Sequence, residues 1–563
     1  MRWYTTFSFI LRGILGLGLC SVIGRIEAGD DDGPVVVLPN PPVAPFVGEP
    51  LEKSPPPVPV HSSIVADPTA SRNQQPTVLG VPTSNTVIPL VNIQTPNASG
   101  VSHNMYSRFD VPERGAILNN SRADVQTQLG GWIQSNPWLS RGSARVILNE
   151  VNSSNPSLLR GFLEVAGNSA QVIIANPSGI TCNGCGFINA YRPTLTTGVP
   201  MYNSGGNLEL YRVERGTIEV TGNGLNAKDA DYTDLIARVV KINAGIWTKK
   251  ELRVTTGANL VKADNTTLPE PISHSSNGAT PTIAIDVAAL GGMYAQKITL
   301  IGTEDGVGVR NVGTIGAGVG EVIVKTNGRL ENTGHIIASA EHNTQIDARD
   351  GIQNKGTIYA GGNTQITTYG SIENNGAIAA FGDTTLEATG DDSIITSSKG
   401  SVLGAGIKSD RTLGTSGKLS VSSTKRLTAQ GQNLSGGDQI FTARSIDLSG
   451  SNTKASNIDL TAHLGDIKLT GTTINVDKIF KANTPQTLYT DQAKVTAAGF
   501  NVTAHNLSNV HGQISQLGDG DLTFKLPGWL DNTHGTIATR SRNFNISAKS
   551  LNNTSGLIHS GNI

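Results

Sequence analysis

Two cysteines three positions apart are the residues of this sequence best suited to chemistry. Cys182 and Cys185 form a Cys-Asn-Gly-Cys unit. A redox enzyme would place such a unit at the start of a helix between two strands, a pattern that the surrounding residues lack. Zinc would require two further ligands at suitable spacing, and no other Cys or His lies nearby in the sequence. We therefore predict a local disulfide, formed in an oxidising compartment, whose short loop adds little stability.

Histidines and carboxylates do not form a recognisable catalytic or metal-binding set. His511 and His534 occupy equivalent places in successive repeats, so we expect them to lie one above the other on the surface. No carboxylate or Cys completes a metal site around them. Enzymes that cleave polysaccharides need carboxylates that converge on one face. The candidates fall at different positions of the repeat, namely Asp347, Asp350, Asp383, Glu387, Asp391 and Asp392. We predict no catalytic residue, metal or cofactor, and keep a polysaccharide-active enzyme as a minor alternative.

The composition indicates an elongated β protein. The 563 residues include 65 Gly, and only 15% are charged and 5% aromatic. Gly and Asn tolerate turn dihedrals, while Ile and Val favour pleated strands, so short apolar runs between turn residues predict many short strands. The formal net charge of −1 provides no long-range field that would attract nucleic acid. We therefore expect no nucleic-acid partner.

The first 91 residues differ from the rest in composition. Residues 1–28 carry Arg2 near the start, continue through an apolar stretch interrupted by Arg12 and end in small and polar residues, which is the layout of a cleaved signal peptide. The alternative, a membrane anchor, would need a longer uninterrupted apolar core than residues 13–23 provide. Residues 33–96 hold 15 of the 26 prolines, and proline lacks the N–H that a sheet or helix needs. We therefore predict a Pro-rich, disordered leader over residues 29–91.

A short unit of Asn, Gly and Ile recurs along the second half of the chain. It is seen as Asn311-Val-Gly-Thr-Ile, Asn332-Thr-Gly-His-Ile, Asn354-Lys-Gly-Thr-Ile and Asn374-Asn-Gly-Ala-Ile, and with one inserted residue after Asn509, Asn532 and Asn553. In the first four units the glycines are 20 to 22 residues apart, which fits three short strands and three turns. A β-propeller would need about twice this period. The predicted fold class is all-β, a right-handed parallel β-helix, with Gly at a corner, Ile in the core and Asn stacked on Asn through amide hydrogen bonds.

Between residues 92 and 300, a series of motifs resembles one known family. In the family's order they are Phe109-Asp-Val-Pro-Glu-Arg-Gly-Ala-Ile-Leu, Leu129-Gly-Gly-Trp-Ile, Ser143-Ala-Arg-Val-Ile-Leu-Asn, Asn155-Pro-Ser-Leu, Ala175-Asn-Pro-Ser-Gly-Ile and Ala284-Ile-Asp-Val-Ala-Ala-Leu-Gly-Gly. This set resembles the secretion (haemagglutination activity) domain of two-partner-secretion exoproteins, such as filamentous haemagglutinin and contact-dependent inhibition toxins. The resemblance implies a secretion domain at 92–300 and β-helical haemagglutinin-type repeats at 301–563. Because the last residues form an ordinary repeat unit, we expect a shortened stalk.

The resemblance also implies where a partner transporter is recognised. In both Asn-Pro motifs the Pro biases the preceding Asn to an extended conformation and favours a turn, and Gly179 permits a positive φ before the next strand. The family often has Asn where this chain has Ser178, a change that a turn tolerates. The motif could act by touching the transporter or through folding alone. The predicted recognition residues are Asn155, Pro156, Ser157, Leu158, Asn176, Pro177, Ser178, Gly179 and Ile180.

A route and a function follow from the same resemblance. The expected route is export to the periplasm, recognition by an outer-membrane β-barrel transporter with periplasmic receptor domains, and secretion or display at the cell surface. The expected function is that of a filamentous haemagglutinin-like adhesin that binds a receptor on host or bacterial cells. The alternative is the delivery stalk of a contact-dependent growth-inhibition toxin. In that family a Val-Glu-Asn-Asn type string precedes the toxin, and its nearest counterpart, Ile372-Glu-Asn-Asn, lies inside a repeat.

Overall fold

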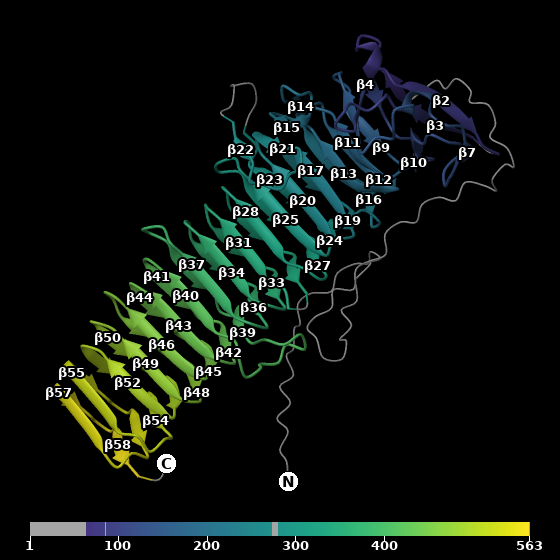
Figure 1. Ribbon diagram of the computed structural model, residues 1–563. Coiled ribbons are helices and arrows are strands. Elements are labelled where there is room, and N and C mark those ends of the chain that lie inside the picture. The colour runs from purple at the N-terminus through teal and green to yellow at the C-terminus, as the bar shows by residue number, and fades with distance from the viewer. Residues whose placement is uncertain (1–62, 85, 273–279, 340, 562–563) are drawn as a thin grey trace, which may run out of the picture.

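Strands stacked across a long axis build an extended rod (Figure 1). The computed structural model describes residues 63–84, 86–272, 280–339 and 341–561. The predicted signal peptide and the leader up to residue 62 lie outside the described residues. Within the described part, the only helices are two 3₁₀ turns, η1 (Arg72–Gln74) and η2 (Pro137–Leu139). No helix in this part of the chain is long and apolar enough to cross a membrane.

Each regular coil consists of three strands that pair in parallel with the equivalent strands of the next coil. One coil contains β26 (Gly308–Asn311), β27 (Thr314–Ala317) and β28 (Val322–Thr326). The next coil contains β29 (Leu330–Asn332), β30 (His335–Ala338) and β31 (Thr344–Ala348). The pairing is in register, because Ile315 lies opposite Ile336 and Asn311 opposite Asn332. The fold is therefore a parallel β-helix, as the repeat predicted.

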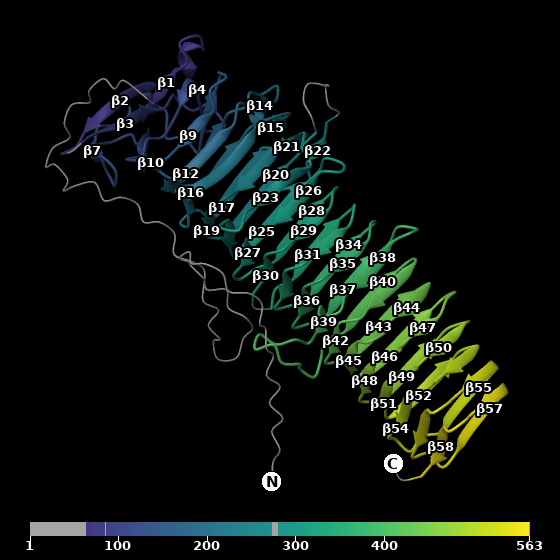
Figure 2. The same cartoon turned by 180° about the vertical axis from the view of Figure 1, so that it is seen from behind.

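Three sheets run along the rod. We call the sheet through β26 and β29 face 1, the sheet through β27 and β30 face 2, and the sheet through β28 and β31 face 3. Figure 1 shows face 3 continuing through β34 (Thr364–Thr368) and β37 (Thr384–Ala388). Figure 2, from behind, shows face 1 continuing through β35 (Ile372–Asn374) and β38 (Ile394–Ser397).

The interior between the three faces is apolar. Side chains alternate in direction along a strand, so every second residue enters the interior. On face 2, Ile315, Ile336 and Ile358 succeed one another and are fully buried. One continuous cluster of buried side chains extends from Ile64 to Ile537. Each such side chain contributes about 1.5–3 kcal/mol before the entropy of ordering is subtracted, so the core is the main source of stability.

The repeated asparagines form a buried amide ladder at the end of face 1. Asn311 Nδ2 donates to Asn332 Oδ1 at 2.8 Å, and Asn332 Nδ2 donates in turn to Asn354 Oδ1 at 2.7 Å. A second ladder joins Asn509, Asn532 and Asn553 with bonds of 2.7 and 2.6 Å. An unpaired buried amide would cost about 1–3 kcal/mol, so stacking in register satisfies groups that could not otherwise be buried. The predicted amide stacking is confirmed.

The repeat glycines are required by the close stacking of coils. A Cβ on Gly334 would lie 2.0 Å from the carbonyl oxygen of Gly313, and one on Gly356 would lie 2.0 Å from that of Gly334. None of these three residues has a positive φ. The corner accepts only Gly because the backbone of the previous coil occupies the place of a side chain.

His511 and His534 lie one above the other, as predicted. The rings of His511 and His534 are stacked with centroids 4.8 Å apart and planes 9° from parallel. Each is the inserted residue of its repeat and has a φ of 54°. Among the described residues, no group of three or more His, Cys, Asp or Glu side chains could hold a metal ion.

The predicted disorder is wrong for residues 63–91. This segment forms β1 (Ile64–Ala66), β2 (Thr77–Pro82) and β3 (Val87–Asn92). Strand β2 pairs antiparallel with β3, and β3 joins face 2 by pairing with β5 (Ala116–Asn120) from Leu90 onward. Pro89 lies before that second pairing begins, so its missing N–H breaks no bond to β5. The high proline content led to a prediction of disorder, although short strands tolerate proline at their ends and on edge strands.

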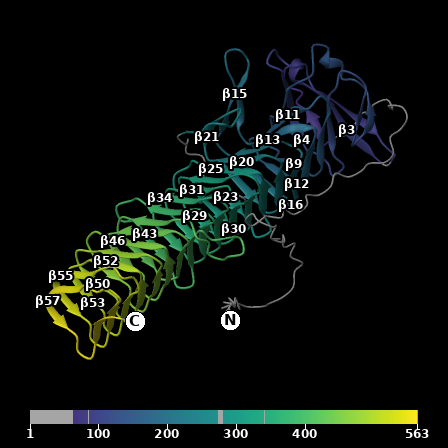
Figure 3. The ribbon, with the colours of Figure 1, turned by 60° about the horizontal axis from the view of Figure 1, so that its bottom comes forward.

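Two antiparallel elements outside the coils were not predicted. The larger is a four-stranded sheet made of β14 (Val199–Tyr202), β15 (Leu208–Val213), β21 (Asn259–Lys262) and β22 (Glu270–Pro271). Figure 3 shows β15 standing out from the rod. It packs Tyr211 and Val261 onto outward side chains of face 3 such as Ile173. The smaller is the hairpin of β6 (Val125–Thr127) and β7 (Gly131–Ile133).

Candidate functional site

The two Asn-Pro motifs lie on adjacent coils at the same corner, between face 3 and face 1. The first motif follows β8 (Val146–Val151) and leads into β9 (Ser157–Leu159). The second follows β11 (Ala170–Ala175) and leads into β12 (Ile180–Ile188). Strands β8 and β11 pair in parallel, as do β9 and β12, with Ser157 opposite Ile180. The fold thus brings all nine predicted recognition residues into one small region, which we call the recognition corner.

Asn176 joins the two turns from inside the corner. Its side chain is fully buried. Asn176 Nδ2 donates to Asn155 O at 2.9 Å and to Ser157 Oγ at 3.0 Å. Its Oδ1 accepts from the backbone N–H of Ser178 at 2.9 Å, and its own N–H donates to Thr196 O of the following coil. Asn176 therefore holds the shape of the corner and has no surface with which to touch a partner.

The predicted recognition residues separate into an outer and an inner group. Asn155, Pro156 and Leu158 are exposed, and Pro177 and Ser178 are half-buried. The inner group, which is buried, consists of Ser157, Asn176, Gly179 and Ile180. Any direct contact with a partner has to be made by the outer group, because only these side chains reach the surface.

Gly179 and Ser178 show why this motif folds as a turn. Gly179 has a φ of +114°, a conformation that a side chain disfavours, as the sequence predicted. Its N–H donates to Asn176 O at 3.0 Å, and its carbonyl accepts from the N–H of Ser157. Ser178 Oγ donates to Ser153 O of the preceding coil at 2.9 Å. The serine therefore adds a bond between coils.

Asp110 belongs to this corner and was missed by the sequence analysis. It lies one coil before Leu158 and is only 2% exposed. Its Oδ1 accepts from the N–H of Leu158 at 2.8 Å, and its Oδ2 pairs with Arg108 Nε at 2.6 Å. Its backbone N–H donates to Ser63 O, which brings the first described residue to the same corner. The motif that begins at Phe109 contained this aspartate, but nothing in its spacing indicated a contact with residue 158.

The two cysteines lie inside the coils rather than at the recognition surface. The structure joins Cys182 to Cys185 by a disulfide, and both residues are buried. They lie opposite Val220 and Leu225 of β16 (Thr217–Ala227), so the sulfurs take the inward places of apolar side chains. Cystine is apolar and fits the core at the bend where β12 passes from face 1 to face 2.

Glu164 is a buried carboxylate near the hairpin of β6 and β7. It lies on β10 (Phe162–Gly167) and is 5% exposed. Burial raises its pKa above the usual glutamate value, and hydrogen bonds to the carboxylate partly offset this shift. The donors are the N–H groups of Gln128 and Leu129, at 2.8 and 2.9 Å. Glu164 therefore fixes the loop that covers the outer side of face 2.

Comparison with known proteins identifies the domain that contains the corner. Residues 62–332 match the family model of the TPS (two-partner secretion) secretion domain. The chain belongs to the two-partner-secretion exoproteins. The matched range is wider at both ends than the predicted 92–300, and it starts just before β1.

The similar proteins include toxins far longer than this chain. The chain is 49% identical over 503 residues to Toxin CdiA of Yersinia pestis, an alignment that covers 89% of this chain and 15% of that protein. It is 45% identical over 412 residues to tRNA nuclease CdiA-2 of Burkholderia pseudomallei strain 1026b, covering 72% and 13%. The crystal structure of the filamentous hemagglutinin secretion domain is 31% identical with a TM-score of 0.43, covering 59% of this chain and 99% of that one. The TPS exoprotein thus spans less than a sixth of either curated relative.

Proposed function

We propose that this chain is secreted through an outer-membrane partner transporter and acts at the cell surface as a filamentous haemagglutinin-like adhesin. The observation that carries the proposal is the recognition corner within the TPS secretion domain. There a buried amide fixes two successive turns whose outer side chains are presented to solvent. The signal peptide predicted at residues 1–28 would deliver the chain to the periplasm.

In this proposal, periplasmic receptor domains of the transporter bind the outer group of the corner. Leu158 is 37% exposed although it is apolar. Pro156 and Pro177 belong to the two turns of the same corner and carry no N–H, so a partner can cover them without leaving a donor unpaired. Asn155 provides an exposed amide at the rim. A small apolar centre with a polar edge is the usual composition of a protein–protein contact.

Folding outside the cell gives a physical reason for outward transport without nucleotide. Each new coil pairs with the coil already formed, as β34 does with β31 and β37 with β34. Each coil also buries several Ile, Val or Leu side chains, at about 1.5–3 kcal/mol apiece before ordering entropy. Nearest-neighbour stacking of this kind propagates from an existing template. Coils that fold outside the outer membrane oppose the return of the chain.

The test of recognition is Leu158→Ser, with Leu290→Ser as the matched control. Leu290 is 87% exposed at a corner between face 1 and face 2 of the same domain. Neither substitution removes a buried side chain, so we expect both variants to fold. Immunoblots of culture supernatant, surface and periplasmic fractions should show that Leu158→Ser accumulates in the periplasm while Leu290→Ser is secreted normally. Equal secretion of the two variants would show that the corner is not the recognition surface.

The adhesive part of the proposal concerns the stalk beyond the secretion domain. Purified secreted protein should bind host cells or other bacteria in a saturable manner, and a variant that ends after the secretion domain should not. Catalysis, cofactors and nucleic acid play no part in the proposal. The receptor is expected on a cell surface, and cell-binding assays with protease-treated or glycosidase-treated cells would establish its class.

A second candidate function is the delivery stalk of a contact-dependent growth-inhibition toxin. It is favoured by the identity of 49% over 503 residues to Toxin CdiA. In this case the chain would place an effector near a target bacterium. The two functions are separated by fusing a known toxin domain after residue 561 and co-culturing with susceptible bacteria. Growth inhibition that depends on the stalk would favour delivery, whereas cell binding without inhibition would favour the adhesin.

A further inference from the structure

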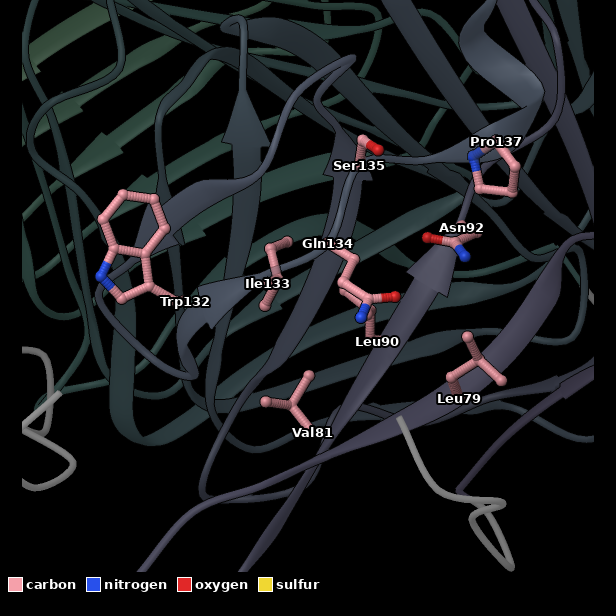
Figure 4. A pocket seen from close by; sticks show the side chains of 9 residues that line it. All are labelled: Leu79, Val81, Leu90, Asn92, Trp132, Ile133, Gln134, Ser135 and Pro137. Carbon is pink, nitrogen blue, oxygen red and sulfur yellow. The ribbon is translucent and has the colours of Figure 1, made fainter. Parts of the chain in front are cut away.

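The N-terminal end of the β-helix carries a groove on the outer side of face 2 that is lined by both apolar and polar side chains. The hairpin of β6 and β7 covers Ile117 and Phe162, and its Ile133 belongs to the same buried cluster as Val81 and Leu90 of the first strands. A groove of about 300 Å³ is left between this hairpin and the pair β2–β3. Figure 4 shows Trp132 at one end, Pro137 and Leu79 at the other, and Val81, Leu90 and Gln134 between them.

The groove is bordered by aromatic rings and by a free strand edge. Trp132 is 40% exposed and Trp138, beyond Pro137, is 44% exposed. Trp138 is held in place by its indole N–H, which donates to Thr77 Oγ1 of β2 at 3.2 Å. Among the described strands, β2 pairs only with β3, so its other edge presents unpaired backbone groups. Such an edge invites association unless another segment covers it.

The chain itself contains a segment with the chemistry to fill this groove. Pro39, Pro42 and Pro45 follow one another at intervals of three, with Phe46 next to the last. A polyproline II helix has three residues per turn, so these prolines would form one apolar ridge. Aromatic-lined grooves bind Pro-x-x-Pro segments in this conformation, because the ridge is rigid and little entropy is lost. The carbonyls of such a helix have no internal partners, and the amide of Gln134 lies in the groove to donate to them.

We propose that residues 39–46 of this chain dock in the groove as a polyproline II helix and act as an internal ligand of the secretion domain. The ridge of Pro39, Pro42 and Pro45 rests between Trp132 and Pro137, and Phe46 extends the apolar contact. The docked segment covers Leu79 and the free edge of β2. The folded protein is thereby protected from association at this end.

The tether has sufficient length. The described chain begins at Ser63, whose carbonyl accepts from the N–H of Asp110 at the recognition corner. Residues 46–62 connect that point to the docking segment, and at about 3.1 Å per residue an extended Pro-rich chain reaches well beyond one side of the rod. A short tether also raises the effective concentration of the segment to about the millimolar range, so weak intrinsic affinity is sufficient.

The test compares the secreted chain with a variant that lacks residues 39–46. In the variant, the amides of residues 77–81 should exchange hydrogen at least about tenfold faster, and Trp emission should shift to longer wavelength. A synthetic peptide of residues 36–49 added to the variant should reverse both changes. The same peptide with Ala at positions 39, 42 and 45 should fail to do so. Trp529→Ala, which removes another partly exposed indole, is the control for Trp132→Ala, and only Trp132→Ala should abolish binding.

Each other outcome would overturn the proposal in a distinguishable way. If the intact chain and the variant dimerise equally, and dimerisation protects residues 77–81, the groove holds a second copy of the chain. If peptide and deletion change neither exchange nor emission, the segment does not dock. If Trp132→Ala binds the peptide as Trp529→Ala does, the segment docks elsewhere. Because these readouts use purified protein, they are independent of whether the transporter binds the recognition corner.

Discussion

Replacing Asn176 by Ala separates folding of the recognition corner from contact with a partner. The change removes two donated bonds, to Asn155 O and Ser157 Oγ, and leaves the partly buried N–H of Ser178 without its acceptor. Two net hydrogen bonds at about 0.5–1.5 kcal/mol each, and one unsatisfied donor at about 1–3 kcal/mol, give an expected loss of about 2–4 kcal/mol after some relaxation. The loss is local because these bonds connect only neighbouring coils.

Native-state hydrogen exchange is the appropriate assay, because global unfolding of a long repeat protein is not two-state. A loss of about 2–4 kcal/mol corresponds to roughly 30- to 700-fold faster exchange of the amides of Ser178 and Gly179. Exchange in distant coils, such as β31 and β34, should be unchanged. Secretion should fall in proportion to the fraction of molecules whose corner is open.

Asn155→Ala provides the matched comparison. Asn155 opens the sibling motif, but its side chain is exposed and only its backbone carbonyl accepts from Asn176. Its replacement should leave the amide exchange rates of the corner within about twofold of those of the parent protein. It should still reduce secretion if the outer group contacts the transporter. Unchanged protection in Asn176→Ala would refute the structural role assigned to that residue. Normal secretion of Asn155→Ala would remove Asn155 from the contact surface.

Three further changes test other parts of the molecule. Gly334→Ala should speed amide exchange in the coils on both sides, since its Cβ would lie 2.0 Å from a backbone carbonyl; Gly318→Ala, with no contact closer than 3.8 Å, should be neutral. Cys182→Val combined with Cys185→Leu, which copies the opposite residues of β16, should lower the local opening free energy of β12, measured by native-state hydrogen exchange, by no more than about 2 kcal/mol. Glu164 has a raised pKa in the folded state, so its contribution to stability is greatest at low pH and is lost as pH rises through the raised pKa; Glu164→Gln should therefore lose less stability than the parent between pH 4 and pH 8. If the stability of the parent and of Glu164→Gln changed in parallel with pH over that range, the raised pKa of Glu164 would be contradicted.

The regular coils were predictable because each repeats the same contacts. The spacing of Gly313, Gly334 and Gly356 sets the length of a coil, and the Asn and Ile at fixed distances from each Gly define what is buried. Nearest-neighbour stacking means that one coil predicts the next. The reason why these corners need glycine was less predictable. The coils approach each other closely there, but the glycines do not have a positive φ.

Pairings without a period were not predictable. Strands β15 and β21 pair although residues 214–258 lie between them in the chain, and neither has a repeated counterpart. The antiparallel strands β2 and β3 were hidden by a proline content that argues for disorder when averaged over a long window. Both elements depend on tertiary packing onto an outer face, which local composition does not report.

The candidate site was predictable as a set of residues but not as a geometry. The two Asn-Pro motifs indicated a functional region, and the structure shows that they lie at one corner on adjacent coils. The sequence could not distinguish Asn155 from Asn176, which open identical Asn-Pro-Ser strings. One is exposed and the other fully buried, because Asn176 alone meets a preceding turn whose carbonyl and hydroxyl it can bind.

The amide ladders have a direction, and this explains which residues lie at their ends. Every Asn donates from Nδ2 to the next coil, so the last member needs an acceptor and the first needs a donor. Asn374, last in the first ladder, donates to Ser397 Oγ at 3.0 Å, and Thr490 Oγ1 lies 2.8 Å from Oδ1 of Asn509, first in the second. A hydroxyl serves at either end because it can both donate and accept. Asn311 Oδ1, by contrast, has no partner among the described residues, since the opposite residue of the preceding coil is Val287. The first ladder thus begins at Asn311, inside the range matched by the secretion domain, at the first coil that has Asn where the preceding coil has Val287. One amide oxygen stays unpaired there, and each later Asn of the ladder accepts a hydrogen bond from the Asn before it.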